Sequence, residues 1–344
     1  MSLDKIMGEI NKKYKTEIIT KGNVVQEVEK IPFSSPRANH MTYGGIPFGR
    51  ATEFFGPENG GKTTSALIIA GQAQKFYPDK QVVFFDLENT LDEEWAKKNG
   101  VNVEDLVIAK PNDQTAEQIL QMVLDIIDSN GASLVVIDSL PMLVPQQLYD
   151  SDVDKKSYGG ISGPLTEFCR RLSPRLARNQ TALIGINQVR DNMDNPYDIY
   201  HSPGGRAWKH LCSLRVYFRR GSFINEKNEE LKSSAEEPFG NLVDMRIIKT
   251  KICKPDRRIG QYTLWYDTGV DKLGDTVFMA VKFNIIVQRG AWFYLMNPET
   301  GEVQQNEKGE DLKFQGKPAL LEHLRENKVL FAEIYEAVQT MLEE

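Results

Sequence analysis

Short apolar runs alternate with longer amphipathic segments over the first half of the chain. The runs are RATEFFG (50–56), QVVFFDLE (81–88), SLVVIDS (133–139) and TALIGINQ (181–188). Between them, residues 63–76 and 115–130 repeat apolar side chains at the spacing of an α-helix. This alternation predicts an α/β fold in which helices cover both faces of a mostly parallel sheet. Ligands of such sheets bind at the carboxyl ends of the strands, so we expect the chemistry of the chain there.

Three later apolar runs follow at closer spacing. They are SLRVYFRR (213–220), NLVDMRIIK (241–249) and QYTLWYD (261–267). We interpret them as antiparallel strands added to one edge of the sheet. Beyond residue 270 the pattern changes again. An aromatic run, RGAWFYLM, is followed by a turn-rich stretch and by helical periodicity, which predicts a small α+β C-terminal domain.

The first residues are polar and charged. LDKIMGEINKKY (3–14) has apolar residues at helical spacing, and TEIITKG (16–22) is compatible with a short strand. A surface arm and an arm that docks on a neighbouring copy both fit this pattern. We therefore predict three units: a helix/strand oligomerisation arm over 1–32, an α/β core over 33–270 and an α+β C-terminal domain over 271–344.

Composition narrows the class of protein. The chain has 344 residues, of which 40% are hydrophobic, enough for one large core and small appendages. The net charge of −6 does not point to a nucleic acid, although local patches could still bind one. Three scattered cysteines without a CxxC pair fit a reducing compartment, and four scattered histidines argue against a zinc site. We find no secretory leader and no run of the roughly 20 apolar residues that cross a bilayer, so we expect a cytoplasmic protein without a membrane partner.

A glycine-rich stretch follows the first strand of the core. GPENGGKTT matches the pattern G-x-x-x-x-G-K-T between a predicted strand and a predicted helix. The glycines allow backbone N–H groups to point at phosphate oxygens, Lys62 is expected to reach the β- and γ-phosphates, and the Thr63 hydroxyl is a ligand for Mg²⁺. The nucleotide-binding residues predicted here are Gly56, Pro57, Glu58, Asn59, Gly60, Gly61, Lys62, Thr63 and Thr64.

Three further predicted strands each end at a polar side chain. Glu88 is placed to orient a water and accept its proton, and Asp138 is placed to reach Mg²⁺ through water. Gln188 is an amide that could bond the γ-phosphate and report its loss to the following loop. Asp86 shares a strand face with Glu88, and we leave open whether it supports the site or is a solvated acid.

Two long polar segments, residues 147–164 and 190–210, lack periodicity. Each follows a strand that ends in a predicted nucleotide contact, so each is a candidate switch and a candidate binding loop for single-stranded nucleic acid. Flexible surface loops would explain the same composition. The candidate DNA contacts are Tyr158, Gly159, Gly160, Arg170, Arg190, Gly204, Gly205 and Arg206.

A basic cluster occupies MRIIKTKICKPDRR (245–258). Lys249 and Lys251 are two residues apart and therefore share a strand face. They could contact the phosphates of a nucleotide held by an adjacent subunit, and a solvated strand end is the equally simple interpretation.

Taken with their order along the chain, these motifs resemble the RecA family of homologous recombinases, in the version carried by bacteriophages. The similar segments are GGIPFGR leading into the glycine-rich loop, FFDLENTLDEEWAKKNGV, VVIDS, INQVR, PGGRAWKH, IIKTKICKP, GAWF and FQGKPALLEHL. They cover most of the chain. The resemblance implies that Glu88 is the catalytic glutamate, that Asp92 and Trp95 contact adenine, and that Lys249 and Lys251 reach the ATP of the neighbouring subunit.

Three positions depart from the family pattern. Trp95 replaces the more usual tyrosine, Gly163 stands where the bacterial proteins place an arginine after the first loop, and Tyr158 replaces a methionine. The DNA contacts of the first loop are therefore the least constrained part of the resemblance.

The resemblance implies a DNA-dependent ATPase that uses Mg²⁺ and forms a helical filament on single-stranded DNA. Such a filament pairs its strand with homologous duplex and exchanges strands. A single-strand-binding protein and a loader would be further partners. Two alternatives share the ATPase core: a ring-shaped hexameric helicase or motor, and a non-catalytic recombination mediator. The lysine pair favours the filament over the ring, and the intact Glu88 argues against the non-catalytic protein.

Overall fold

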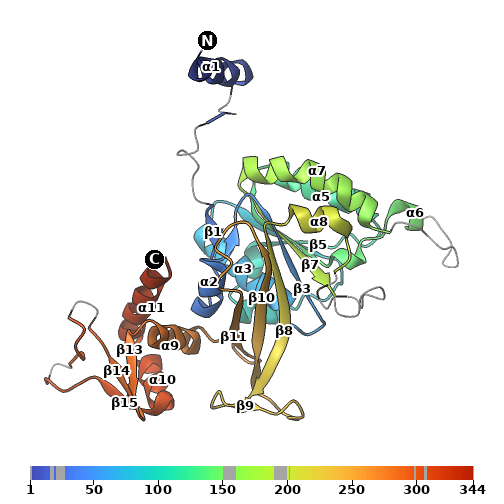
Figure 1. Ribbon diagram of the computed structural model, residues 1–344. Coiled ribbons are helices and arrows are strands. Elements are labelled where there is room, and N and C mark those ends of the chain that lie inside the picture. The colour runs from blue at the N-terminus through green and yellow to red at the C-terminus, as the bar shows by residue number, and fades with distance from the viewer. Residues whose placement is uncertain are drawn as a thin grey trace.

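The computed structural model describes residues 2–15, 19–20, 28–149, 160–189, 200, 202–297, 300–305 and 308–343. Over these residues a central sheet of ten strands separates two groups of helices, and a smaller C-terminal unit stands beside the sheet (Figure 1). The predicted Tyr158, Gly159 and Arg190 contacts lie outside the described residues.

The parallel part of the sheet confirms the expected α/β alternation. Its six strands, in spatial order, are β8 (Leu214–Ile224), β3 (Ala51–Gly56), β7 (Ala182–Gln188), β6 (Ala132–Asp138), β4 (Gln81–Asp86) and β5 (Leu106–Ala109). Four of these strands were predicted as the alternating runs, and β8 was expected to be antiparallel. It instead pairs in parallel with β3, while its other edge is antiparallel to β10. The short β5 was missed, since only LVIA marks it.

The antiparallel extension lies at one edge of the sheet, as the spacing predicted. It consists of β10 (Gly240–Thr250), β11 (Ile259–Trp265) and β12 (Gly269–Val270), and β9 (Glu230–Leu231) pairs with the end of β8. A separate two-stranded ladder joins β1 (Lys30–Ile31) to β2 (Ile46–Pro47).

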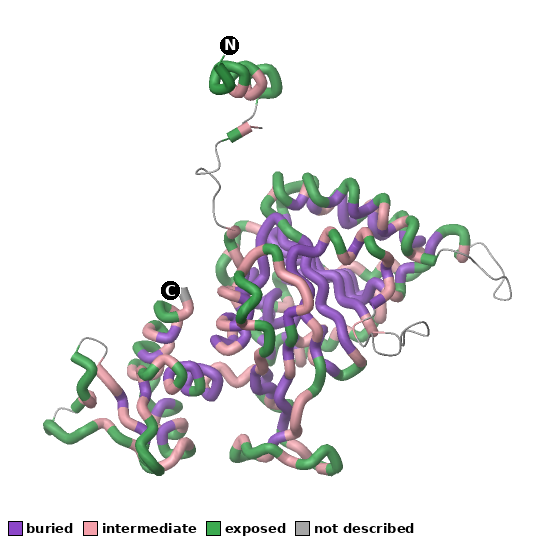
Figure 2. The backbone as a smooth tube through the Cα atoms, viewed as in Figure 1, coloured by how far each residue is buried: buried purple, intermediate pink, exposed green. Residues whose placement is uncertain are grey.

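Helices bury an apolar layer on each face of the sheet. One face carries α3 (Lys62–Phe76) with α2 (Pro36–Thr42), and the other carries α5 (Ala116–Asp128), α7 (Ser162–Asn179) and α8 (Gly205–Leu211). Figure 2 shows the buried strands between these layers. Two short helices lie in connections of the sheet. After β4 come α4 (Glu93–Lys98) and the 3₁₀ turn η2 (Val103–Asp105), which leads into β5, and after β6 come the 3₁₀ turn η3 (Leu140–Met142) and α6 (Gln146–Tyr149).

The C-terminal unit has a hydrophobic cluster of its own. It combines α9 (Lys272–Lys282), α10 (Gly316–Glu326) and α11 (Lys328–Glu343) with the antiparallel strands β13 (Ile286–Arg289), β14 (Trp292–Leu295) and β15 (Lys313–Gln315). Buried Asp275 on α9 accepts hydrogen bonds from Ser35, Arg37 and Thr263, so polar contacts as well as packing join this unit to the core.

The predicted N-terminal helix is present as α1 (Leu3–Tyr14), and most of the adjoining 16–22 segment lies outside the described residues. Figure 1 shows α1 apart from the rest of the chain. No residue of α1 is buried, although Leu3, Ile6 and Tyr14 are large apolar side chains.

Candidate nucleotide-binding site

The glycine-rich loop joins the carboxyl end of β3 to the amino end of α3. A Cβ atom at Gly56 would lie 2.0 Å from the Phe218 carbonyl oxygen, and one at Gly61 would lie 2.9 Å from a methyl of Val243. Gly61 also has a φ of 90°, a conformation that other residues rarely adopt. Glycine is therefore required at both ends of the loop because β8 and β10 lie directly against it.

Lys62 lies under the loop that it is predicted to serve. Its ammonium group donates to the carbonyl oxygens of Gly56 at 3.1 Å and Pro57 at 2.6 Å. Burial lowers the pKa of Lys62, while the carboxylates of Asp138, Glu88 and Glu58 oppose that shift. Its two hydrogen bonds thus fix the Lys62 cation at the amino end of α3, and the amino end of a helix attracts phosphate.

Thr63 and Asp138 bring two hard oxygen ligands together. The Thr63 hydroxyl donates to Asp138 Oδ2 at 2.7 Å, and Asp138 is only 4% exposed. A hydroxyl and a carboxylate that supplement nucleotide phosphates and water are the donors that Mg²⁺ takes in phosphoryl-transfer sites. The residues therefore fit Mg²⁺. Among the described residues, no cluster of three or more His, Cys, Asp and Glu side chains suggests another metal site.

Burial raises the pKa of Asp138 to about 6, with the Thr63 hydrogen bond acting in the opposite direction. Because the folded chain favours the neutral acid, this group stabilises the fold fully below about pH 4, and that contribution is lost as the pH rises through 6. Without Mg²⁺ and nucleotide, we expect Asp138→Asn to be more stable than the wild type at pH 7.5 by roughly 2–3 kcal/mol.

Chemical unfolding in EDTA between pH 4 and 8 measures this difference. The advantage of Asp138→Asn should vanish near pH 4, whereas the exposed turn variant Asp79→Asn should show no such trend. A difference independent of pH would contradict the raised pKa.

Glu88 and Gln188 face the same pocket. Together with residues 58–64, Asp138, Ser139 and Ile186 they line a cavity of about 360 Å³. Ser139 donates a hydrogen bond to Glu88 Oε1, which orients the carboxylate. Ser139 was missed from the sequence, although its place directly after Asp138 in SLVVIDS was a usable signal.

Asp86 supports the turn that carries Glu88. It is 1% exposed and accepts the backbone N–H groups of Thr90 and Leu91 at 3.1 and 3.2 Å. Lys110 lies 3.8 Å away as an ion-pair partner. Of the two interpretations left open, the solvated acid is therefore wrong, and Asp86 is a buried structural group.

Asp92 and Trp95 lie next to the loop without lining the cavity. Asp92 caps α4 by accepting the Trp95 backbone N–H, and Trp95 Nε1 donates to the Thr64 hydroxyl at 3.1 Å. The indole is thus fixed against the first turn of α3.

Lys249 and Lys251 lie elsewhere. Lys249 Nζ contacts the carbonyl oxygens of Lys209 at 2.5 Å and His210 at 2.9 Å, and Lys251 Nζ contacts that of His210 at 2.9 Å. Both ammonium groups therefore satisfy the carboxyl end of α8. The two lysines were predicted to share a strand face, but β10 ends at Thr250 and Lys251 lies just beyond it. Among the described residues, neither lysine belongs to the cavity around the glycine-rich loop of its own chain.

The described ends of the two predicted loops lie side by side. A Cβ at Gly205 would lie 3.2 Å from Ser162 Oγ, and one at Gly204 would lie 3.2 Å from a methyl of Leu165. Gly160 and Arg206 are exposed beside these positions in the chain, and Arg170 is exposed further along α7. The predicted bounds of both loops extend too far toward the C-terminus, because α7 begins at Ser162 and α8 begins at Gly205, after Gly204 with its left-handed backbone conformation.

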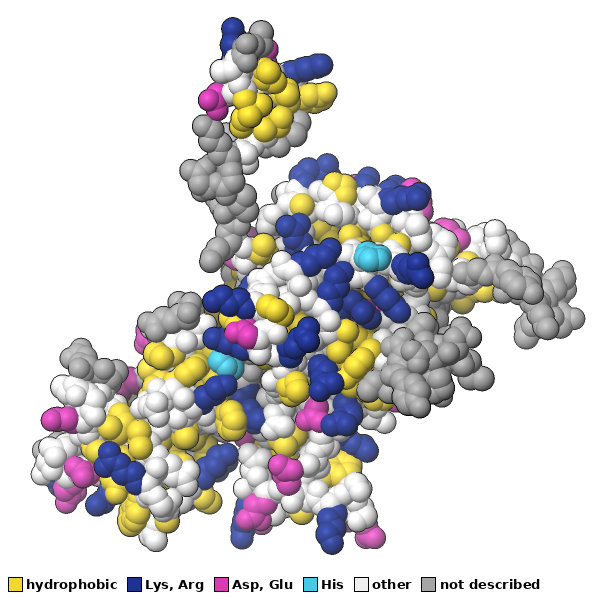
Figure 3. Space-filling view, in the orientation of Figure 1, with side chains coloured by type: hydrophobic (Ala, Val, Ile, Leu, Met, Phe, Trp, Pro, Cys, Tyr) yellow, Lys and Arg dark blue, Asp and Glu magenta, His cyan; other side chains and the backbone are white. Residues whose placement is uncertain are grey.

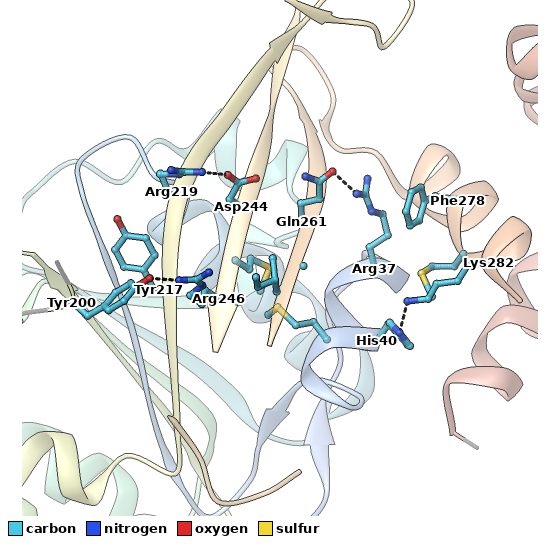
Figure 4. A pocket seen from close by; sticks show the side chains of 15 residues that line it. Arg37, His40, Tyr200, Tyr217, Arg219, Asp244, Arg246, Gln261, Phe278 and Lys282 are labelled. Atoms are coloured by element: carbon cyan, nitrogen blue, oxygen red, sulfur yellow. Dashed lines mark hydrogen bonds and ion pairs between the residues drawn. The ribbon is translucent and has the colours of Figure 1, made fainter. Parts of the chain in front are cut away.

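A second cavity, about 650 Å³, lies between the antiparallel strands and α2 and α9. Figure 4 shows the cations that line it, with Arg219 against Asp244, Arg246 against Tyr200, and Lys282 against His40. Burial and the nearby Lys282 and Arg257 lower the pKa of His40 to about 4. Lys and Arg side chains gather on this face (Figure 3). From the sequence, only the basic cluster at residues 245–258 indicated this surface, because the other cations that line the cavity come from distant segments of the chain.

Comparison with known proteins gives consistent results. A family model described as the RecA N-terminal domain matches residues 1–271. "Protein RecA" of Thermus aquaticus is 33% identical over 338 residues, covering 97% of this chain and 92% of that protein. "Protein RecA" of Methylobacterium sp. strain 4-46 is 32% identical over 294 residues, covering 84% and 77% respectively. These two relatives are bacterial, and the bacteriophage branch stays a prediction.

A structure described as that of the RadB recombinase superposes with a TM-score of 0.49 at 17% identity, over 68% of this chain and 95% of that one. Among the described residues, no helix is long and apolar enough to cross a membrane.

Proposed function

Since the chain belongs to the RecA family, we propose that it is an ATP-dependent DNA recombinase that coats single-stranded DNA as a helical filament. The observation that supports this most strongly is the convergence of four strand ends on one pocket. The glycine-rich loop, Glu88, Asp138 and Gln188 come from β3, β4, β6 and β7 and face the same cavity. The proposed reaction is homologous pairing followed by strand exchange, driven by ATP binding and released by hydrolysis.

Each residue around the pocket has one proposed task. Lys62 holds the β- and γ-phosphates, and Glu88 accepts a proton from the attacking water while Ser139 keeps its carboxylate oriented. Thr63 and Asp138 would hold Mg²⁺, which supplies charge neutralisation at the phosphates. Gln188 bonds the γ-phosphate, and Asp92 and Trp95 contact the adenine side.

Lys249 and Lys251 are proposed to act on the nucleotide of the adjacent protomer. Two observations favour this assignment: both ammonium groups lie together at the carboxyl end of α8, and both lie outside the pocket of their own chain. A head-to-tail interface of this kind generates a helical filament when the rotation between protomers does not close into a ring. The exposed apolar side chains of α1 are proposed to dock on the neighbouring copy in the same assembly.

A mixing experiment tests the lysine assignment. Lys249→Ala/Lys251→Ala lacks the lysines but keeps Glu88, and Glu88→Gln keeps the lysines. Each variant alone is expected to be nearly inactive in DNA-stimulated ATP hydrolysis. An equal mixture should recover about a quarter of the wild-type rate, because random head-to-tail assortment rebuilds that share of complete sites.

The outcome separates action across an interface from action within one chain. If the mixture is no more active than the sum of its parts, the lysines do not serve a neighbouring site. Because the lysines also cap α8, thermal unfolding of the double variant is the control for loss of fold.

DNA is proposed to contact the joined ends of the two loops, at Gly160, Gly204, Gly205 and Arg206, together with Arg170 on α7 and the three contacts outside the described residues. The described ends of the loops adjoin each other at Ser162 and Gly205, and Gly160 and Arg206 are exposed there, where a backbone N–H group and a guanidinium could meet phosphates. The basic cavity between the antiparallel strands and α9 offers a further polyanion surface on the same molecule. Single- and double-stranded DNA are therefore the proposed partners, with a single-strand-binding protein and a loader as accessory proteins.

The two alternatives predict different behaviour. A ring-shaped motor would move along DNA and would unwind a duplex in a strand-displacement assay. A non-catalytic mediator would bind ATP without DNA-stimulated turnover. Glu88 with its Ser139 partner inside the pocket favours a catalytic protein.

A further inference from the structure

Four buried polar side chains form one hydrogen-bonded network beneath the phosphate pocket. They are Glu53, Asn187, Ser202 and Arg215, which are 0%, 0%, 1% and 8% exposed. Their neighbours on this face of the sheet include the fully buried Trp208 and Cys212. A carboxylate and a guanidinium in such surroundings are costly unless their partners are complete.

Glu53 is the centre of the network. Its Oε1 accepts hydrogen bonds from Asn187 Nδ2 at 2.9 Å and Ser202 Oγ at 3.0 Å, and its Oε2 accepts Arg215 Nε. Arg215 Nη2 donates to Ser202 Oγ at 3.1 Å. The Ser202 hydroxyl therefore bridges both members of a buried ion pair.

The network links three strands near the nucleotide site. Glu53 lies directly opposite Arg215 in the β3–β8 register, and β3 continues into the glycine-rich loop at Gly56. Asn187 comes immediately before Gln188, whose side chain lines the phosphate cavity. The Asn187 Oδ1 atom accepts the Gln188 backbone N–H at 3.0 Å.

The network also holds the segment that leads into α8. Asn187 Nδ2 donates a second hydrogen bond, to the Pro203 carbonyl oxygen at 2.9 Å. Ser202 and Pro203 directly precede Gly204 and Gly205, which both have positive φ angles. One asparagine thus contacts both the backbone of Gln188 and the backbone that presents the proposed DNA contacts.

Packing alone does not require these charges. Well-packed apolar side chains of similar volume often stabilise a core as well as a buried ion pair does, whereas polar partners define one relative arrangement of the segments they join. The segments joined here are the strand before the phosphate loop, the strand that ends in Gln188, and residues 202–205.

We propose that Glu53, Arg215 and Ser202 are positioning residues that couple nucleotide binding to DNA binding. By fixing residues 202–205 relative to Gln188, they transmit a contact at the γ-phosphate to Gly204, Gly205 and Arg206. This inference rests on the proposed function, because it assigns a route to the coupling that a nucleotide-dependent DNA-binding protein must contain.

Ser202→Ala is the variant that tests this route. It removes the hydroxyl that joins residue 202 to Glu53 and Arg215, and it leaves the ion pair itself in place. The measurement is the affinity for a single-stranded oligonucleotide with and without a non-hydrolysable ATP analogue. We expect the ratio of the two affinities to fall about 10-fold, within the usual range of allosteric coupling, while analogue binding without DNA is unchanged.

Two matched variants isolate the role of the hydroxyl. Ser133→Ala removes another buried serine hydroxyl, which donates to the Gln81 carbonyl oxygen at the opposite end of the sheet, and should keep the wild-type ratio. Ser202→Thr retains a hydroxyl and should restore most of the coupling. If Ser202→Ala lowers the unfolding temperature but leaves the ratio of the two DNA affinities unchanged, Ser202 has only a structural role. That result would overturn the inference.

The wild-type chain provides a test that needs no substitution. Amide hydrogen exchange of residues 202–211 should slow when the ATP analogue is added without DNA. Unchanged exchange there, with protection confined to the glycine-rich loop, would contradict the route. If the wild type binds DNA equally with and without the analogue, the proposed function fails as well. If the wild type is coupled and Ser202→Ala is equally coupled, only this inference fails.

Discussion

Replacing Lys62 with alanine is expected to abolish ATP binding in the accessible concentration range. The lysine is a buried cation at the amino end of α3, directly below the loop that would enclose the phosphates. Two charge-assisted hydrogen bonds to phosphate oxygens, each contributing about 1.5–3 kcal/mol, correspond to an affinity loss of roughly 100-fold or more. Equilibrium titration with a fluorescent ATP analogue measures the loss.

Lys75→Ala is the matched control, since Lys75 is an exposed lysine in the last turn of the same helix. Its ATP affinity should equal that of the wild type. Because Lys62 also satisfies two carbonyl groups of the loop, circular dichroism and thermal unfolding should accompany the titration. A folded Lys62→Ala with normal ATP affinity would remove the nucleotide from this site.

Glu88→Gln is expected to bind ATP and DNA normally and to hydrolyse ATP about 10²–10⁴ times more slowly. The substitution keeps the shape of the side chain and a hydrogen-bond acceptor for Ser139, but an amide cannot accept the proton of the attacking water. Single-turnover hydrolysis separates the chemical step from product release. Turnover in Glu88→Gln equal to the wild-type rate would exclude Glu88 as the general base.

Glu94→Gln supplies the comparison for general effects of losing a carboxylate. Glu94 is exposed on α4, where its carboxylate pairs with Lys98 one turn further along the helix. Its hydrolysis rate should remain at the wild-type value. The Glu88→Gln protein should also be the better reagent for trapping the DNA-bound assembly, because bound ATP would persist.

The sequence predicted the part of the fold that follows from local periodicity. The strands that lead to the glycine-rich loop, Glu88, Asp138 and Gln188 are mostly apolar runs, because they are buried on both faces of a parallel sheet. The direction of β8 was not predictable in the same way. Its apolar pattern is compatible with either direction, and only its place between β3 and β10 decides the pairing.

The site was predictable to the extent that its chemistry is contiguous in the chain. Lys62 and Thr63 belong to one recognisable loop, and the acids at strand ends are expected to converge on it. The structure adds the partners that spacing cannot reveal, such as Ser139 with Glu88 and Trp95 with Thr64. These contacts depend on how separate turns pack together.

Long-range polar contacts were the least predictable features. In the sequence, Glu53 is a single acidic residue within an apolar strand. Its hydrogen-bond partners lie more than 130 residues further along the chain. The basic cavity combines cations from α2, β8, β10 and α9, and no local charge count identifies such a set. Both features arise from the tertiary arrangement of the sheet.

The central claim is that ATP binds between protomers assembled on DNA. Its most direct test is the steady-state rate of ATP hydrolysis, with and without single-stranded DNA, over a range of protein concentrations. The account predicts strong stimulation by DNA and a rate per protomer that rises cooperatively with protein concentration. A rate per protomer that is independent of both DNA and protein concentration would contradict it.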